Sequence, residues 1–141
     1  MFYEKDRLLK ISDRTDPYFN NVFKKARPQI FISLPMSDVD EETVKNKMNA
    51  IFNAFVKLTD MEIFGPILMD TYNKTFPEID QDLFDKHVYC LGDSIKLMSK
   101  ADMVIFADDA PIARGCCIEH KICVEYDINY TTEMEVLSYE P

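Results

Sequence analysis

Residues 101–120 read ADMVIFADDAPIARGCCIEH and contain the clearest strand-turn-helix pattern of the chain. The apolar run at 103–107 favours a strand that is covered on both faces. The turn at 108–111 is expected to open a helix, because Pro111 suits a first helical turn. Apolar spacing carries this predicted helix to about Tyr126.

The chain before and after this stretch continues the alternation of strands and helices. An apolar run predicts a strand at 29–34, and Ser37 or Asp38 is expected to cap the next helix, with Glu41 and Glu42 in its first turn. The remaining expectations are a strand at 62–64, a loop over 66–80, a helix over 81–100 with a weak point at Gly92, and short strands near 128–132 and 135–139.

The resulting β-α-β-α-β-α-β order predicts an α/β fold with a parallel sheet, since parallel strands need crossover connections. We expect one α/β domain over 29–141, preceded by an N-terminal extension over 1–28. Open parallel sheets bind ligands at the carboxyl ends of their strands. The loops at 34–38 and 108–115 are therefore the candidate ligand-binding loops.

The charge and hydropathy of the chain argue against some classes of partner. The 141 residues include 25 acidic and 16 basic side chains, and the net charge is -9. Tight binding to nucleic acid polymers needs basic side chains that replace counterions, so we expect none. No apolar run approaches the ~18 residues that span a bilayer, and no signal peptide is apparent. We therefore expect a cytoplasmic protein without membrane contacts. Residues 1–28 differ from the rest, with seven basic and four acidic side chains.

The four cysteines, Cys90, Cys116, Cys117 and Cys123, are expected to be reduced thiols, as is usual in the cytosol. Cys116, His120 and Cys123 share one helical face and offer three soft zinc ligands, but no fourth ligand is evident. Buried cysteines are also common in protein cores. We therefore expect no bound metal, with a structural zinc module as the weaker alternative.

Glu119 lies at a helical position where a solvent-exposed acidic residue is not expected. On a helical wheel it falls in the apolar arc of Ile112, Cys116, Ile118, Ile122, Cys123 and Tyr126, opposite Arg114, Lys121 and Glu125. A buried carboxylate is costly unless it is paired or protonated. One interpretation is a glutamate bonded to a backbone or tyrosine group, or a helix at an oligomer interface. The other is a carboxylate directed into a ligand pocket, with His120 as a structural neighbour.

Several other polar residues allow both a structural and a functional interpretation. Asp108 and Asp109 follow a predicted strand, where they either face a ligand or stabilise the turn. Asp93 and Ser94 lie in the middle of a helix, and a solvated surface is the simplest expectation for both. His87 lies on the apolar stripe of the same helix and is expected in the core.

Residues 114–120, RGCCIEH, resemble the RGC-x-IEH helix of small phage and bacterial members of the nucleoside 2-deoxyribosyltransferase-like superfamily. Residues 101–106 resemble that family's AD-x-V-x-F strand, 31–36 its first strand and substrate loop, and 91–98 its middle helix. The resemblance covers about 29–128. It implies a Rossmann-like, flavodoxin-type parallel sheet with helices on both faces.

The resemblance also implies an enzyme that cleaves the N-glycosidic bond of a nucleoside or nucleotide, as a 2-deoxyribosyltransferase or as a hydrolase. Glu119 matches the family's nucleophile, which attacks the anomeric carbon and forms a glycosyl ester. Asp93 is the candidate second catalytic carboxylate, although the usual spacing from Asp102 falls on Ser94. No metal or organic cofactor is implied, and a homo-oligomer is expected. The candidate substrate-binding residues are Ser33, Pro35, Met36, Ser94, Asp108, Asp109, Arg114 and Gly115.

The chain departs from the family pattern in ways that leave a second function open. Asp109-Ala110 stands where close relatives usually have a Gly-Trp-like pair, and Cys117 replaces a common basic residue. The alternative is a catalytically weak or inactive protein of the same fold that sequesters or senses a nucleoside or nucleotide. Ser33, Ser37 and Arg114 are available to a 5′-phosphate, but the acidic residues within 38–42 repel one, so a nucleoside or a weakly charged ligand is favoured.

Overall fold

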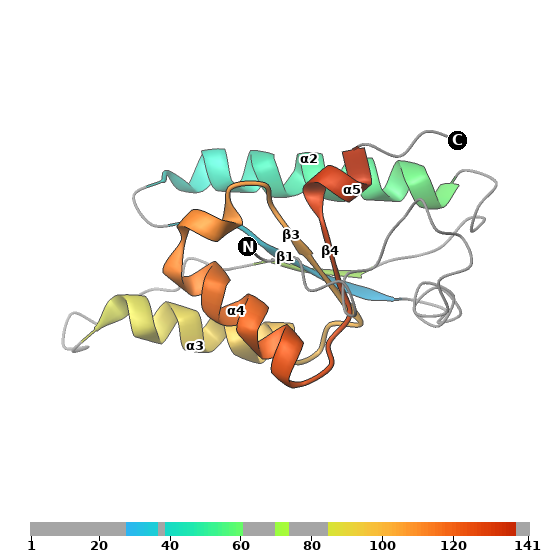
Figure 1. The fold of residues 1–141 in the computed structure, drawn as a ribbon. Coiled ribbons are helices and arrows are strands. Elements are labelled where there is room, and N and C mark those ends of the chain that lie inside the picture. Colours follow the sequence, from blue (N-terminus) through green and yellow to red (C-terminus); the bar gives the residue numbers. More distant parts are fainter. Residues whose placement is uncertain (1–27, 37–38, 61–69, 74–84, 138–141) are drawn as a thin grey trace.

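The computed structural model describes residues 28–36, 39–60, 70–73 and 85–137. Strands and helices alternate along this part of the chain, as the sequence predicts (Figure 1). The elements are β1 (Gln29–Ser33), α2 (Glu41–Asp60), β2 (Asp70–Asn73), α3 (Lys86–Met98), β3 (Met103–Phe106), the 3-10 helix η1 (Ala110–Ile112), α4 (Arg114–Glu125), β4 (Tyr130–Thr132) and α5 (Glu133–Leu137).

The four strands form one parallel sheet in the order β2-β1-β3-β4. Phe106 pairs with Ser33 on one side and with Thr132 on the other, and Asn73 pairs with Ile32. Because every strand runs in the same direction, these residues end their strands at one edge. We call this edge of the sheet, at Asn73, Ser33, Phe106 and Thr132, the carboxyl edge.

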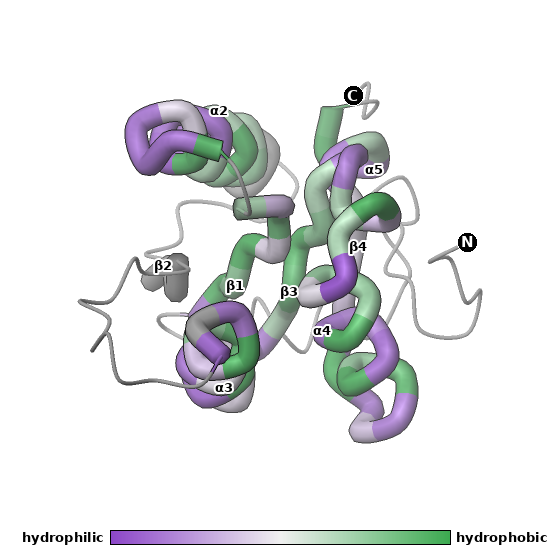
Figure 2. Tube along the Cα trace, turned by 90° about the vertical axis from the view of Figure 1, so that its left-hand side faces the viewer, coloured by the Kyte–Doolittle hydropathy of each residue, from purple (hydrophilic) through white to green (hydrophobic). Residues whose placement is uncertain are grey.

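Alternate residues of β1 enter two separate hydrophobic clusters, because side chains of a strand alternate between its faces. Ile30 and Ile32 pack with residues of α2 and α5, whereas Phe31 packs with residues of α3 and α4. Figure 1 shows α2 and α5 on one side of the strands and α3 and α4 on the other, and the apolar tubes of β1 and β3 run between these helices in Figure 2. The fold is thus α/β with a parallel sheet and is compatible with a Rossmann-like architecture.

One loop prediction and one strand prediction differ from the structure. Strand β2 occupies Asp70–Asn73, inside the predicted loop, while the predicted strand at 62–64 lies outside the described residues. This edge strand is polar, and its pairing with β1 through the main chain does not need an apolar side-chain pattern. The predicted strand at 135–139 is wrong for its described part, which belongs to α5. The Thr132 hydroxyl accepts the Glu135 N–H at 3.3 Å and favours the helical turn.

The helix starts also differ in detail from the predictions. Ser37 and Asp38 lie outside the described residues, and Asp40 caps α2 instead: its carboxylate accepts the Thr43 N–H at 3.2 Å and the Thr43 hydroxyl at 2.6 Å. These bonds lower the pKa of Asp40 below its ordinary value. Pro111 lies in the first turn of η1, which begins at Ala110, and α4 begins only at Arg114.

Helix α3 begins at Lys86, later than the predicted start at residue 81. Residues 81–84 lie outside the described part of the chain. The Asp85 carboxylate accepts the N–H groups of His87 at 2.9 Å and Val88 at 3.2 Å. Gly92 does not interrupt this helix. None of the described helices combines the length and apolar character that crossing a bilayer requires.

Candidate functional site

Glu119 is fully buried at the carboxyl edge, with an exposed fraction of 0%. It comes from α4, and Ser33, the last residue of β1, donates its hydroxyl to Oε1 of Glu119 at 3.1 Å. Ser33 is itself fully buried. The expected burial of Glu119 is confirmed, and its observed partner is a serine from a strand 86 residues away in sequence. Ser33 and Glu119, two of the predicted site residues, are therefore brought together.

Cys123 lies one helical turn beyond Glu119 and shares its buried face. Burial, followed by the negative charge of Glu119, raises the pKa of the Cys123 thiol to about 12. The thiol is therefore neutral near neutral pH. A neutral, buried thiol places no competing charge next to Glu119.

The Cys123 thiol is expected to make stability depend on pH in the alkaline range. An unfolded thiol ionises near 9.0, whereas the folded thiol keeps its proton to about 12. The raised folded pKa means that this contribution is complete below pH 9.0 and is lost as the pH rises toward 12. In urea titrations, the stability advantage of the wild type over Cys123→Ala should therefore shrink above pH 9.0. An advantage that stays constant across this range would contradict the assignment.

His120 packs in an aromatic cluster that fixes α4 on the sheet. Its ring lies 5.5 Å from Phe106 and 5.0 Å from Tyr130, and the two latter rings lie 5.6 Å apart, all in edge-to-face geometry. The structural interpretation of His120 therefore agrees with its packing. The cluster joins β3, β4 and α4 directly beside Glu119.

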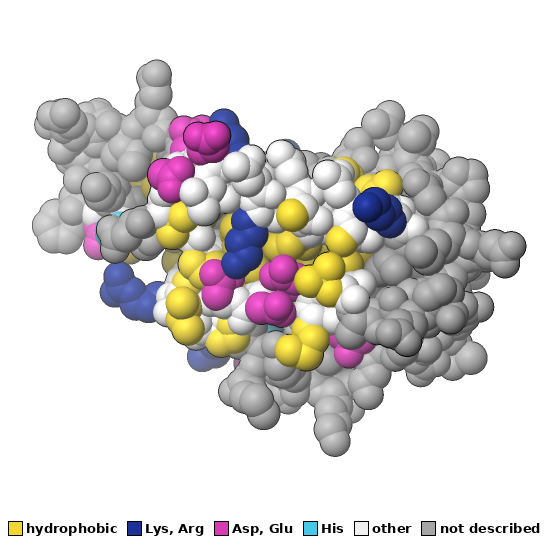
Figure 3. Space-filling model, turned by 90° about the horizontal axis from the view of Figure 1, so that it is seen from above, with side chains coloured by type: hydrophobic (Ala, Val, Ile, Leu, Met, Phe, Trp, Pro, Cys, Tyr) yellow, Lys and Arg dark blue, Asp and Glu magenta, His cyan; other side chains and the backbone are white. Residues whose placement is uncertain are grey.

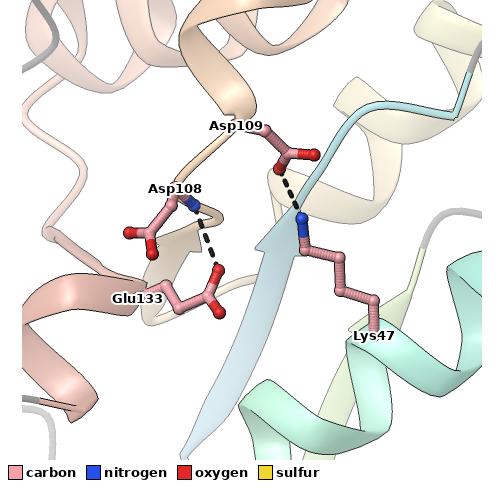
Figure 4. A network of polar contacts seen from close by, with 4 residues as sticks. All are labelled: Lys47, Asp108, Asp109 and Glu133. Carbon is pink, nitrogen blue, oxygen red and sulfur yellow. Dashed lines mark hydrogen bonds and ion pairs between the residues drawn. The ribbon is translucent and has the colours of Figure 1, made fainter.

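The turn after β3 is held at two successive residues (Figure 4). Lys47 of α2 forms an ion pair with Asp109, with 2.6 Å between Nζ and Oδ1. The backbone N–H of Asp108 donates to Oε1 of Glu133, the first residue of α5, at 3.1 Å. Asp109 thus contacts a protein cation, while the Asp108 side chain is exposed.

The remaining predicted site residues have diverse surroundings. Pro35 and Met36 are half-buried after β1, and Met36 packs against the cluster that joins β1 to α2. Arg114 is exposed at the start of α4. A Cβ added at Gly115 would lie 3.6 Å from Leu91, which is an ordinary contact, so this position does not require glycine.

On α3, the solvated-surface expectation is wrong for Ser94, which is buried, while Asp93 is half-buried. His87 is exposed, so its predicted place in the core is also wrong. His87 lies in the first turn of α3. The contact of this helix with the cluster around Phe31 is made at its other end, by Met98.

The wheel of α4 predicts too broad a buried face. The buried positions follow a narrow stripe at i, i+3, i+4 and i+7, made up of Cys116, Glu119, His120 and Cys123. Ile112, Ile118 and Tyr126 are exposed, contrary to the prediction. The helical period predicts which positions share a face. It does not predict how much of that face the rest of the protein covers.

The cysteines and histidines do not form a metal centre in the part of the chain that the structure describes. None of the four cysteines, all of which lie in the described residues, forms a disulfide. No group of three or more His, Cys, Asp or Glu side chains among the described residues is arranged to hold a metal ion. The weaker zinc alternative is therefore not supported for Cys116, His120 and Cys123.

Lys47 and Glu133 are residues near the carboxyl edge that the sequence does not single out. Lys47 lies 62 residues before Asp109, and its position on a charged helix resembles that of any solvated lysine. Glu133 falls between two segments that were predicted as strands. No local sequence signal identifies either contact.

Comparison with known proteins gives no match: no family model, curated protein or solved structure is significantly similar to the chain. The resemblance of residues 114–120 to the nucleoside 2-deoxyribosyltransferase-like superfamily therefore stays a prediction, and a function has to be argued from Glu119 and its surroundings.

Proposed function

We propose that this chain cleaves the N-glycosidic bond of a nucleoside or nucleotide, with Glu119 as the nucleophile. The observation that carries the proposal is a fully buried carboxylate at the carboxyl edge of a parallel sheet, held by the hydroxyl of Ser33. Burying a carboxylate is costly, and the carboxyl edge is where α/β sheets bind their ligands. The RGCCIEH motif supports the same role for Glu119.

The chemistry suits a carboxylate. An oxygen of Glu119 attacks the anomeric carbon, the bond from this carbon to the base nitrogen breaks, and the base leaves with the bonding electron pair and takes up a proton. The positive charge that develops on the sugar is stabilised by the nearby anion. Water then hydrolyses the glycosyl ester, or a second base displaces the carboxylate, and the free carboxylate is restored.

The fold that we propose is of the flavodoxin type. The observed strand order β2-β1-β3-β4 corresponds to the first four strands of that arrangement, in which ligands bind beside the first and third strands. Ser33 ends β1, and Glu119 follows β3. Because Glu119 has no exposed surface, a substrate reaches it only when side chains at the carboxyl edge move.

Ser33 has the role of a positioning residue that holds Oε1 of Glu119. We expect Ser33→Ala to lower kcat by about 10- to 100-fold, since a hydrogen bond to a charged group contributes ~1.5–3 kcal/mol. Ser33→Thr keeps a hydroxyl and is expected to retain more of the activity. Steady-state kinetics of both variants test this role. An alanine variant with the kcat of the wild type would exclude it.

The proposed reaction is tested by incubating the protein with deoxynucleosides, ribonucleosides and their 5′-monophosphates, and by measuring the released base by chromatography. A free acceptor base is included in a parallel set. Base release without the acceptor identifies a hydrolase, and base exchange identifies a transferase. Absence of both reactions across the panel would contradict the proposed function.

The complete burial of Glu119 favours one alternative, a protein that binds the nucleoside or nucleotide without turnover. A ligand that binds the folded state raises the apparent stability of the protein. Strong thermal stabilisation by a member of the same panel, without base release, would identify this binding protein. Turnover would exclude it.

A further inference from the structure

Large hydrophobic side chains are exposed on both sides of the sheet. On one side, Val88 and Tyr89 of α3 and Ile118 of α4 are 64%, 42% and 44% exposed. On the other side, Met134 and Leu137 of α5 are 60% and 61% exposed. Figures 1 and 2 show the pair α3 and α4 on one face of the strands and the pair α2 and α5 on the other. Grouped apolar side chains in solvent are typical of interaction surfaces.

The helices α3 and α4 form one continuous surface. A Cβ added at Gly115 of α4 would lie 3.6 Å from Leu91 of α3, so the two helices are in contact at this point. Val88 lies one helical turn before Leu91, and Ile118 lies one turn after Gly115. The two exposed side chains therefore flank this contact. We call the outer side of the two helices, with Val88 and Ile118, the α3–α4 surface.

The exposed charged side chains of the α3–α4 surface are mainly basic. Lys96 of α3 and both Arg114 and Lys121 of α4 are exposed. Glu125 is the one acidic side chain that is exposed on these two helices, within the part of them that the structure describes. This basic surface belongs to a chain whose net charge is -9, so the acidic side chains lie mostly elsewhere.

The helices α2 and α5 form a second surface with the opposite charge. The acidic side chains that are exposed or half-buried on this side include Glu41, Glu42, Asp108, Glu133 and Glu135. Two of its lysines, Lys45 and Lys47, are already paired with carboxylates of the same side. Met134 lies between two of the acidic residues, and Figure 3 shows hydrophobic and acidic side chains close together over these helices. We call this side, with Met134 and Leu137, the α2–α5 surface.

We propose that the α3–α4 surface of one copy of this chain docks on the α2–α5 surface of a second copy. The exposed apolar side chains of the two surfaces then cover one another, and their burial favours association. Arg114 and Lys121 of one copy meet the carboxylates beside Met134 of the other. Opposite charges favour this contact, whereas either surface against its own copy would bring like charges together.

The proposed contact is head to tail, because it joins two different surfaces. Each copy can use its second surface to bind a further copy, so the assembly grows into a ring or a filament larger than a dimer. This inference goes beyond the expected homo-oligomer because it names both contacting surfaces, and it does not depend on the proposed function.

Sedimentation velocity of the full chain at rising micromolar concentrations tests the contact. The wild type is expected to form species larger than a dimer. Ile118→Gln and Met134→Gln each remove an apolar side chain from one surface, and each should raise the Kd of association at least about tenfold. Both side chains are exposed in a single copy, so circular dichroism should show that the variants fold. Ile112→Gln is the matched control: Ile112 is 82% exposed but lies in η1, outside both surfaces, and this variant should associate as the wild type does.

A mixture of Ile118→Gln and Met134→Gln tests the head-to-tail arrangement. Each variant supplies the intact surface that the other lacks, so at a concentration where each alone is monomeric the mixture should form complexes of two chains, one of each variant. A wild type that stays monomeric at every concentration would overturn the inference, and so would assemblies that neither variant weakens. A wild-type dimer whose variants form no mixed complex would also overturn it, because that result indicates a surface that contacts its own copy. If a variant does not fold, Val88→Gln or Leu137→Gln takes its place on the same surface, with the same expected results.

Discussion

Glu119→Gln is expected to lower base release by at least about 1,000-fold, because the loss of a covalent nucleophile removes most of the catalytic effect of a site. The amide has nearly the shape of the carboxylate and can still accept the Ser33 hydroxyl, so the fold should be retained. It lacks the negative charge that attacks the anomeric carbon and stabilises the developing oxocarbenium ion. Chromatography of the released base gives the rate, and circular dichroism checks the fold.

Glu125→Gln is the matched control for this substitution. Glu125 is the last residue of α4 and is exposed, so the same change of charge there should leave both base release and folding as in the wild type. A folded Glu119→Gln protein that releases base at the wild-type rate would exclude Glu119 as the nucleophile.

Phe106→Ala is expected to lower the free energy of unfolding by about 3–5 kcal/mol. Phe106 is fully buried in the cluster shared by β1, β3, β4 and α4, and its ring contacts both His120 and Tyr130. Removing the ring leaves a cavity and also loosens the contact that places α4, and with it Glu119, on the sheet. Urea titration followed by circular dichroism measures the change.

Tyr126→Ala removes an aromatic ring of similar size from the exposed end of α4. Because this ring is mostly in solvent, we expect the free energy of unfolding to change by no more than about 0.5 kcal/mol. Equal losses in Phe106→Ala and Tyr126→Ala would contradict the described core.

The central strands and the position of Glu119 can be predicted from the sequence because their signals are local. The apolar runs of β1 and β3 are typical of strands covered on both faces, and the structure confirms both. Glu119 stands out because a carboxylate interrupts an apolar helical face, and it is indeed buried. The burial of β1, β3 and Glu119 can therefore be predicted from the side chains within their own segments.

Other features depend on contacts that the local pattern does not contain. The strand β2 is specified by main-chain pairing with β1 and not by apolar side chains, so its polar sequence resembles a loop. The segment that forms α5 carries apolar residues that also suit a strand. The hydrogen bond from the Glu135 N–H to the Thr132 hydroxyl favours the helical turn instead. The partners Ser33 of Glu119 and Lys47 of Asp109 come from distant parts of the chain. Only the sheet topology brings them together.

The most direct test of Glu119 as the nucleophile is mass spectrometry of the protein quenched with acid during turnover, followed by peptide mapping. We expect a fraction of the protein to carry the mass of one sugar residue, attached to the peptide that contains Glu119, and we expect this adduct to disappear in Glu119→Gln. A sugar adduct on a different residue, formed equally by Glu119→Gln, would contradict the account.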